Sequence, residues 1–137
     1  MRKYLIFFLL SGAAFAADCP VRLKLFNSFA PTGNAMYVDY ENASDKTLQA
    51  VEFHVVTYDA MNDAHDMFEN EIDQKKLEPG KGHKAYFSRP DLITRGNSQG
   101  GAEVYVKKAL FVDGSSWLDD GSHQCLIGDN IRKKHTK

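Results

Sequence analysis

Histidine and acidic side chains are the first residues of this 137-residue chain to test for chemistry. Glu52 and His54 lie two positions apart, so in a strand they share a face and could supply two ligands to a metal ion. The other internal histidines, His65, His83 and His123, show none of the spacings of zinc motifs. We therefore favour an exposed polar strand face and expect no metal or other cofactor.

Two acid-rich segments, 59–66 and 119–124, have the oxygen-rich composition of calcium loops. Both lack the alternating D-x-D-x-D-G spacing and the distant glutamate of such loops, so hydrated turns explain them better. The chain also lacks a G-x-S-x-G segment and a glycine-rich loop between a strand and a helix. We predict a protein that is not an enzyme, with a metal-dependent or hydrolytic secreted enzyme as the alternative.

The first residues, MRKYLIFFLLSGAAFAADCP, predict export. Arg2 and Lys3 precede an apolar run, and Ala14 and Ala16 are the small residues that a signal peptidase reads. The apolar run is shorter than the roughly 20 residues of a membrane span. We expect residues 1–16 to be a cleaved signal peptide, and the protein to be secreted or periplasmic without membrane insertion after cleavage.

Charge and cysteine content narrow the possible functions further. Without the signal peptide the chain has 15 basic and 18 acidic residues, which does not suggest a nucleic-acid partner. Cys19 and Cys125 are its two cysteines, and an even number in an exported chain predicts a disulfide, with two free thiols as the alternative. We expect one domain at 17–128 and a polar tail at 129–137.

Alternation of apolar and polar residues predicts half-buried antiparallel strands. It is clearest in three segments, VRLKLF, AMYVDYEN and LQAVEFHVVTYD. The residues predicted to face inward in them are Val21, Leu23 and Leu25, then Met36, Val38 and Tyr40, then Val51, Phe53, Val55 and Thr57. Between the strands, NASDKT at 42–47, EPGKG at 78–82 and Asp113-Gly114 predict turns.

Two places in the pattern are ambiguous. Near Lys107 and Lys108 the alternation slips, which indicates a β-bulge; the alternative is strict alternation with Lys108 buried, at an energetic cost. Segment 61–77 contains a helical stripe, but a loop followed by a strand at about 70–77 fits the surrounding pattern better.

About seven short strands separated by turns predict an all-β, antiparallel sandwich of the immunoglobulin or fibronectin type. In such a sandwich FVDGSSWLDDGSHQC, residues 111–125, is the last hairpin. Asp113-Gly114 makes its turn, Trp117 fills the core, and Cys125 is tied to Cys19. The segment Asn42-Ala43-Ser44 also matches an N-glycosylation sequon.

Three of these segments carry a family resemblance. VDYENASDKTLQAVEFHVVTYDA, KLEPGKGHKAYF and VYVKKALFVDGSSW together resemble the FxLYD-like bacterial domains of unknown function. The name-giving motif aligns with residues 55–59, where Tyr58 and Asp59 match it. The resemblance covers about 80 residues, and it implies a small exported β-sandwich without catalytic residues.

Four tyrosines, Tyr37, Tyr58, Tyr86 and Tyr105, fall on the outward phase of their strands. If their strands are neighbours, they form a binding patch; otherwise they are ordinary strand tyrosines. The leading hypothesis is an exported, non-enzymatic module that binds another exported or cell-envelope protein. A small secreted inhibitor or effector acting through the loop at 89–101 is a further alternative.

Overall fold

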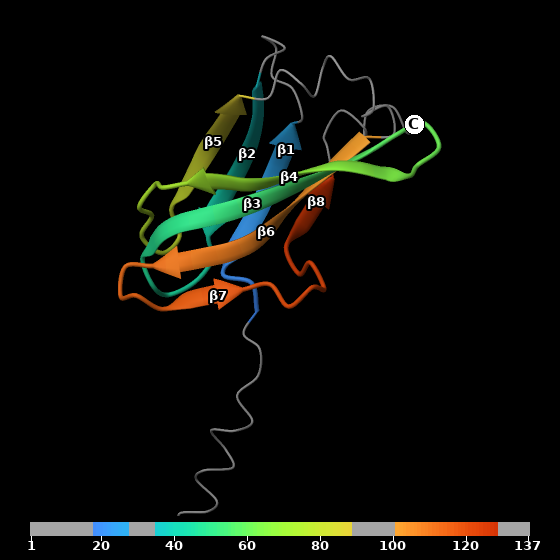
Figure 1. Ribbon diagram of the computed structural model, residues 1–137. Helices are drawn as coiled ribbons and strands as arrows, with labels where there is room; N and C mark the ends of the chain where they lie inside the picture. The colour runs from blue at the N-terminus through green and yellow to red at the C-terminus, as the bar shows by residue number, and fades with distance from the viewer. Residues whose placement is uncertain (1–17, 28–34, 89–100, 129–137) are drawn as a thin grey trace, which may run out of the picture.

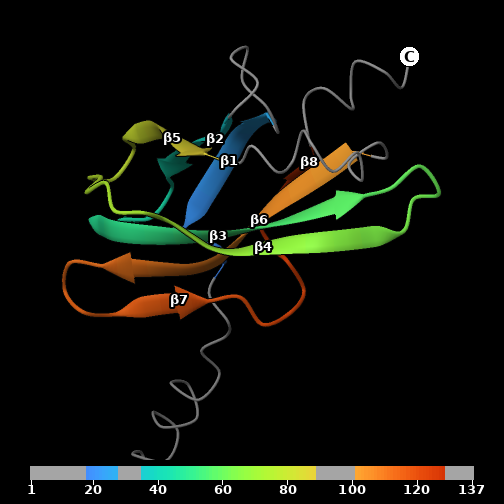
Figure 2. The ribbon, with the colours of Figure 1, turned by 45° about the horizontal axis from the view of Figure 1, so that its top comes forward.

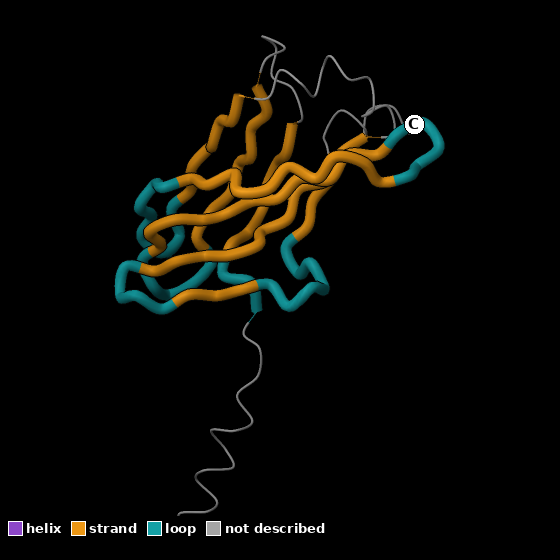
Figure 3. The backbone as a smooth tube through the Cα atoms, in the orientation of Figure 1, coloured by secondary structure: helices purple, strands orange, loops and turns teal. Residues whose placement is uncertain are grey.

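Two antiparallel sheets packed face to face form the part of the chain that the computed structural model describes, residues 18–27, 35–88 and 101–128 (Figure 1). These residues form strands and connecting turns (Figure 3), and none of them belongs to a helix able to span a membrane. The predicted signal peptide, 1–16, and tail, 129–137, lie outside the described residues.

The predicted sandwich is confirmed, with eight strands in the described part of the chain. The strands are β1 (Val21–Asn27), β2 (Ala35–Asn42), β3 (Leu48–Tyr58), β4 (Ala64–Asp73), β5 (Gly82–Ser88), β6 (Gly101–Phe111), β7 (Ser116–Leu118) and β8 (Leu126–Gly128). Sheet I has the order β1-β2-β5 and sheet II the order β4-β3-β6-β7, with β8 also paired to β6. Figure 2 shows the two layers, and successive described strands change sheet after β2, β4 and β5.

The core lies between the sheets and uses the inward residues that the alternation predicts. Val51, Phe53, Val55 and Thr57 of β3 are fully buried, and so are the three predicted inward residues of β2. Burial of one such apolar side chain contributes about 1.5–3 kcal/mol relative to exposure. These two strands therefore form the centre of the hydrophobic core.

A β-bulge in β6 confirms the slip near Lys107 and Lys108. Lys108 lies opposite Glu52, whereas Val106 lies opposite Phe53, so one residue of β6 has no counterpart in β3. The extra residue turns Ala109 and Phe111 toward the core and leaves Lys108 exposed. Solvation of the lysine and burial of the apolar residues are thus achieved together.

A second bulge, in β1, shows that the prediction was wrong for one inward-facing residue. Leu23 pairs with Tyr40 and Leu25 pairs with Asp39, so the ladder skips Lys24. Leu25 consequently shares the outer face with Asp39, and the fully buried Phe26 takes the inward position predicted for Leu25.

The ambiguous segment 61–77 is a strand, not a helix, and the strand begins earlier than predicted. β4 occupies Ala64–Asp73 and forms a hairpin with β3. Its turn is made by Asp59, whose carboxylate accepts hydrogen bonds from the backbone N–H of Met61 and Asp63 at 2.9 Å. The chain therefore reverses at once, and only an isolated bridge between Leu77 and Leu48 follows at the end of the segment.

The predicted disulfide between Cys19 and Cys125 is present, with the two Cα atoms 6.1 Å apart. Cys19 precedes β1 of sheet I, and Cys125 precedes β8 of sheet II. The bond therefore fastens the two sheets together at one end of the sandwich.

Candidate functional site

Trp117 lies at the edge of the sandwich and not in the centre of the core. It pairs with Ala109 across the β6–β7 ladder, so it occupies an inward-facing position as predicted. However, β7 has only three residues at the edge of sheet II, and Trp117 packs against the core while staying partly exposed. The prediction that Trp117 fills the core is therefore correct in that its side chain faces inward, but wrong in that the side chain is not fully buried.

A pocket of about 330 Å³ lies beside this tryptophan and is called the Trp117 pocket here. Its apolar wall comes from Trp117, Phe111 and Pro20, next to the disulfide at Cys19. Its remaining lining residues are polar or small: Asp18, Ala43, Ser44, Asp45, Lys46, Ser115 and Ser116. An apolar pocket with a few convergent polar groups is the usual form of a small binding site.

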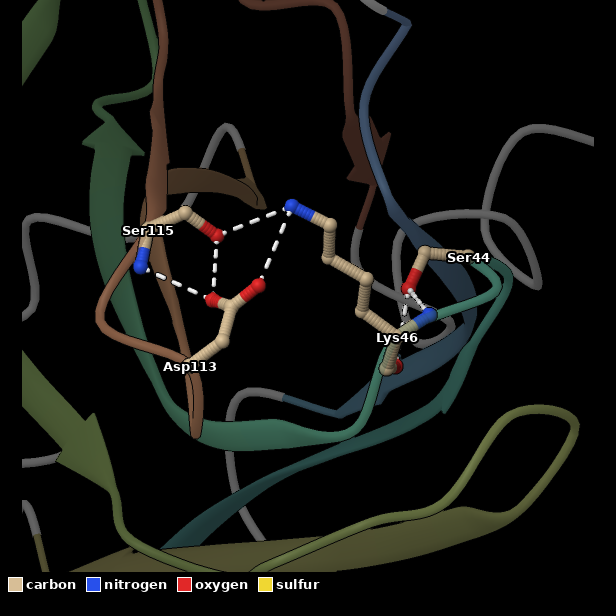
Figure 4. Close-up of polar contacts among 4 residues, drawn as sticks. All are labelled: Ser44, Lys46, Asp113 and Ser115. Atoms are coloured by element: carbon tan, nitrogen blue, oxygen red, sulfur yellow. Dashed lines mark hydrogen bonds and ion pairs between the residues drawn. The ribbon is translucent and has the colours of Figure 1, made fainter.

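A polar rim on this pocket joins the 43–47 turn to the β6–β7 turn (Figure 4). Lys46 Nζ donates a hydrogen bond to Ser115 Oγ at 3.0 Å and lies 3.4 Å from Asp113 Oδ2. The hydroxyl and the backbone N–H of Ser115 both donate to Asp113 Oδ1, at 2.5 and 2.9 Å. These bonds from Ser115, and to a smaller extent Lys46, lower the pKa of the Asp113 carboxyl.

The rim does not have the geometry of a serine activated by a lysine. A lysine that activates a serine must act as a base, which usually requires burial. The Lys46 side chain is 48% exposed and is paired with Asp113, so it serves as a cationic donor. Ser115 directs its own proton to the same carboxylate. The rim therefore places the ammonium group of Lys46 in a defined position at the edge of the Trp117 pocket.

Asn42 holds the 43–47 turn from the inside. Its fully buried side-chain amide donates to the carbonyl oxygens of Lys46 and Leu77, at 2.7 and 2.9 Å. Its Oδ1 accepts from both the backbone N–H and the hydroxyl of Ser44. Since the nitrogen that would carry a glycan is enclosed and bonded, the Asn42-Ala43-Ser44 sequon is not accessible in the folded chain.

Glu52 and His54, for which an exposed polar face was expected, lie together on the outer face of sheet II, but His54 is only 8% exposed there. Glu52 Oε2 and His54 Nε2 are 2.7 Å apart, and His54 Nδ1 lies 3.3 Å from the hydroxyl of Tyr105. The ring of His123 stacks on Tyr105 with centroids 3.8 Å apart. Both nitrogens of His54 are thus engaged, and the described part of the chain holds no group of three or more His, Cys, Asp or Glu arranged for a metal ion.

The second acid-rich segment, 119–124, is organised by its own backbone. The Asp119 carboxylate accepts from the backbone N–H groups of Gly121, His123 and Gln124, at 2.9 to 3.3 Å. Asp120 accepts from Ser122, and these bonds lower the pKa of the Asp120 carboxyl. These contacts are those of a turn closed by aspartate side chains, with Asp119 itself buried and Asp120 exposed.

One polar cluster was missed by sequence reasoning. Tyr40 of sheet I donates its hydroxyl proton to Asp73 Oδ2 at 2.5 Å, and His83 Nδ1 lies 2.8 Å from the same oxygen. Asp73 belongs to sheet II, so the cluster links the two layers. Burial, followed by the bond to and charge of Asp73, raises the pKa of Tyr40 far above its usual value. The sequence did predict that Tyr40 faces inward, and a buried tyrosine hydroxyl usually has a hydrogen-bond partner, so a polar partner could have been expected.

The four outward tyrosines divide between the two sheets and do not form one patch. Tyr37 and Tyr86 lie on sheet I with ring centroids 5.5 Å apart. Tyr58 and Tyr105 lie on sheet II, where Tyr58 donates to Glu103 and Tyr105 is only 5% exposed. By exposure and mutual contact, the candidate patch reduces to the pair on sheet I.

Comparisons with protein-family models and with curated proteins found no match to this chain.

Proposed function

We propose that this chain is an exported, non-enzymatic binding module that recognises another exported or cell-envelope protein through the Trp117 pocket. Two observations support export: the signal-like N-terminal segment and the disulfide, a bond that persists mainly in oxidising compartments. The resemblance to FxLYD-like domains, which implies a small exported sandwich, supports the same proposal.

The observation that carries the proposal is the partly exposed Trp117 beside a hollow of about 330 Å³. Tryptophan is enriched among the residues that dominate protein interfaces, where it pairs with pockets and anchor groups of the partner. The disulfide and the bonds of Asn42 hold the surrounding turns, so little ordering cost remains for binding.

The test is site-specific photo-cross-linking in the compartment to which the protein is exported. A photoreactive phenylalanine analogue replaces Trp117 in one variant and Leu118 in a matched control, since Leu118 lies on the opposite face of the same strand. The analogue keeps a large aromatic ring at position 117, whereas Trp117→Ala removes it. We expect a discrete cross-linked protein at position 117 that is absent at position 118. Wild-type protein should compete for it, and a Trp117→Ala variant should not.

Identical products at both positions, or none at either in protein with an intact disulfide, would contradict the proposal. Trp117 is the chain's only tryptophan, so its fluorescence gives a second readout. Addition of the purified partner should shift the emission of the wild-type protein.

A further inference from the structure

The outer face of sheet I carries an exposed aromatic pair that the Trp117 pocket does not use. Tyr37 and Tyr86 are direct partners across the β2–β5 ladder, and their ring planes are inclined at 46°. Tyr86 is 62% exposed, which is unusual for a large ring. The Tyr37 hydroxyl lies 3.5 Å from Asn27 Nδ2 of β1, which can donate to it and so position its ring.

A cation is placed directly at this pair. Lys84 is two residues before Tyr86 on the same face of β5, and its ammonium group lies 4.8 Å from the centroid of the Tyr37 ring. The ring faces attract the cation and hold it next to the exposed surface. An ammonium group and an open phenol ring are therefore presented side by side.

The charge of this face differs in sign from that of the chain. The whole chain has a net charge of −1. On the outer face of the described strands of sheet I, the cations Arg22, Lys24 and Lys84 outnumber the acids Asp39 and Glu41. Arg22 and Lys24 are both paired with Glu41, and Asp39 lies directly opposite Lys84 in the ladder. The face consequently keeps a surplus of one cation, which suits an anionic ligand.

We propose that the Tyr37–Tyr86–Lys84 face binds an acidic polysaccharide. One side of a pyranose ring presents C–H groups with slight positive charge, which pack well on the electron-rich face of a tyrosine ring. A sugar carboxylate next to that ring reaches the ammonium of Lys84 and forms an ion pair. Tyr86 supplies the stacking surface, Lys84 the charge, and Tyr37 the position of Lys84.

The same observations favour a polysaccharide over a protein partner. The face is the surface of a regular three-stranded sheet, and its exposed large apolar side chain in the described residues is Tyr86. A protein interface usually has an apolar centre of several residues, whereas a sugar ring needs one or two aromatic rings flanked by polar groups. Binding here is independent of the Trp117 pocket, which lies at the disulfide end of the sandwich.

The experiment measures retardation of the mature protein in native gels containing polygalacturonate, alginate or hyaluronate, with the neutral polymer galactan for comparison. We expect retardation by at least one of the acidic polymers and less by galactan. Tyr86→Ala and Lys84→Met should each weaken binding about tenfold. Lys108→Met, which removes an exposed lysine from sheet II, is the matched control and should bind as the wild type does.

Salt and cross-linking complete the test. Added salt should weaken binding of the wild type but hardly that of Lys84→Met. No retardation by any of the three acidic polymers, or unchanged binding by Tyr86→Ala, overturns the proposal. Equal binding of galactan overturns the assignment of an acidic ligand. A photoreactive group at position 86 that captures a protein instead of polysaccharide also overturns it.

Discussion

The 43–47 turn is held from two sides, and the two attachments differ in kind. On the inner side the Asn42 amide is fully buried and bonded to Lys46, Leu77 and Ser44. On the outer side the ammonium of Lys46 meets Asp113 and Ser115, with the Lys46 and Asp113 side chains about half exposed, 48% and 53%. The same turn thus has a buried attachment at Asn42, called the inner support, and a solvent-exposed attachment at Lys46, called the outer rim.

This difference separates a residue that stabilises the pocket, Asn42, from residues that can bind a ligand in it, such as Lys46. A buried amide that loses its partners leaves unsatisfied groups away from water, which is costly. An exposed ion pair contributes little to stability because water competes for both charges. The outer rim can therefore exchange its partners for those of a ligand, while the inner support cannot.

The largest loss of stability is expected from removing the disulfide, which closes this end of the sandwich covalently. The bond between Cys19 and Cys125 closes a loop with a sequence separation of 106, so the double variant Cys19→Ser/Cys125→Ser should lose about 4–5 kcal/mol of unfolding free energy. Urea unfolding measures this loss. Reductant should destabilise the wild type and leave the variant unchanged, and a loss under about 1 kcal/mol would refute the estimate.

Asn42→Ala should have the next largest effect, because it removes the inner support of the turn. The variant loses four side-chain hydrogen bonds, two donated to the carbonyl oxygens of Lys46 and Leu77 and two accepted from Ser44, although the Ser44 hydroxyl and the backbone N–H of Leu48 can still donate to those carbonyls. At about 1 kcal/mol for each lost bond, we expect a loss of about 2–4 kcal/mol. Asn42→Asp keeps the acceptor for Ser44 but not the donors, and it should be nearly as unstable. If urea unfolding shows both variants near wild type, the inner support is not structural.

Tyr40→Phe tests the buried contact between the two sheets. Loss of the hydrogen bond to Asp73 should lower the free energy of unfolding by about 1–2 kcal/mol. The pKa of Tyr40 is raised in the folded state above the ordinary value of 10.0, so its contribution is complete below that pH and declines as the pH rises above it. Above about pH 10 the wild type should lose up to about 1.4 kcal/mol per pH unit more than Tyr40→Phe.

Denaturant unfolding at a series of alkaline pH values measures this difference. Tyr86→Phe is the matched control, since it removes the hydroxyl of an exposed tyrosine from the same sheet. Parallel pH profiles for wild type and Tyr40→Phe would contradict a Tyr40 pKa raised by burial and by Asp73.

The sequence predicted the sandwich, the disulfide and the β6 bulge because each depends on local pattern or on cysteine number. Alternation identifies the inward side chains of β3, and a buried Lys108 would have been costly, so the slip could be placed. The β1 bulge was missed because both Leu25 and Phe26 are apolar, and alternation alone could not decide between them. The start of β4 depended on a reversal made by Asp59.

The candidate site was harder to predict because strand order is a property of the whole fold. Alternation tells which face of its own strand a tyrosine occupies, but not which sheet the strand joins. Tyr37 and Tyr86 therefore met on sheet I, while Tyr105 was separated from them and covered by His123. The Trp117 pocket likewise depends on three segments distant in the sequence: 18–20, 43–46 and 111–117.

Lys46→Met should have the smallest effect on stability and a clear effect on binding. It keeps the length of the side chain but removes the ammonium that Ser115 and Asp113 meet at the rim. Because the pair is solvated, urea unfolding should match that of the wild type within error. Cross-linking of the partner from position 117 should nevertheless fall several-fold, and Lys108→Met should leave it unchanged. Normal cross-linking by Lys46→Met, or a stability loss as large as that of Asn42→Ala, would remove the distinction between a structural support and a recognition rim.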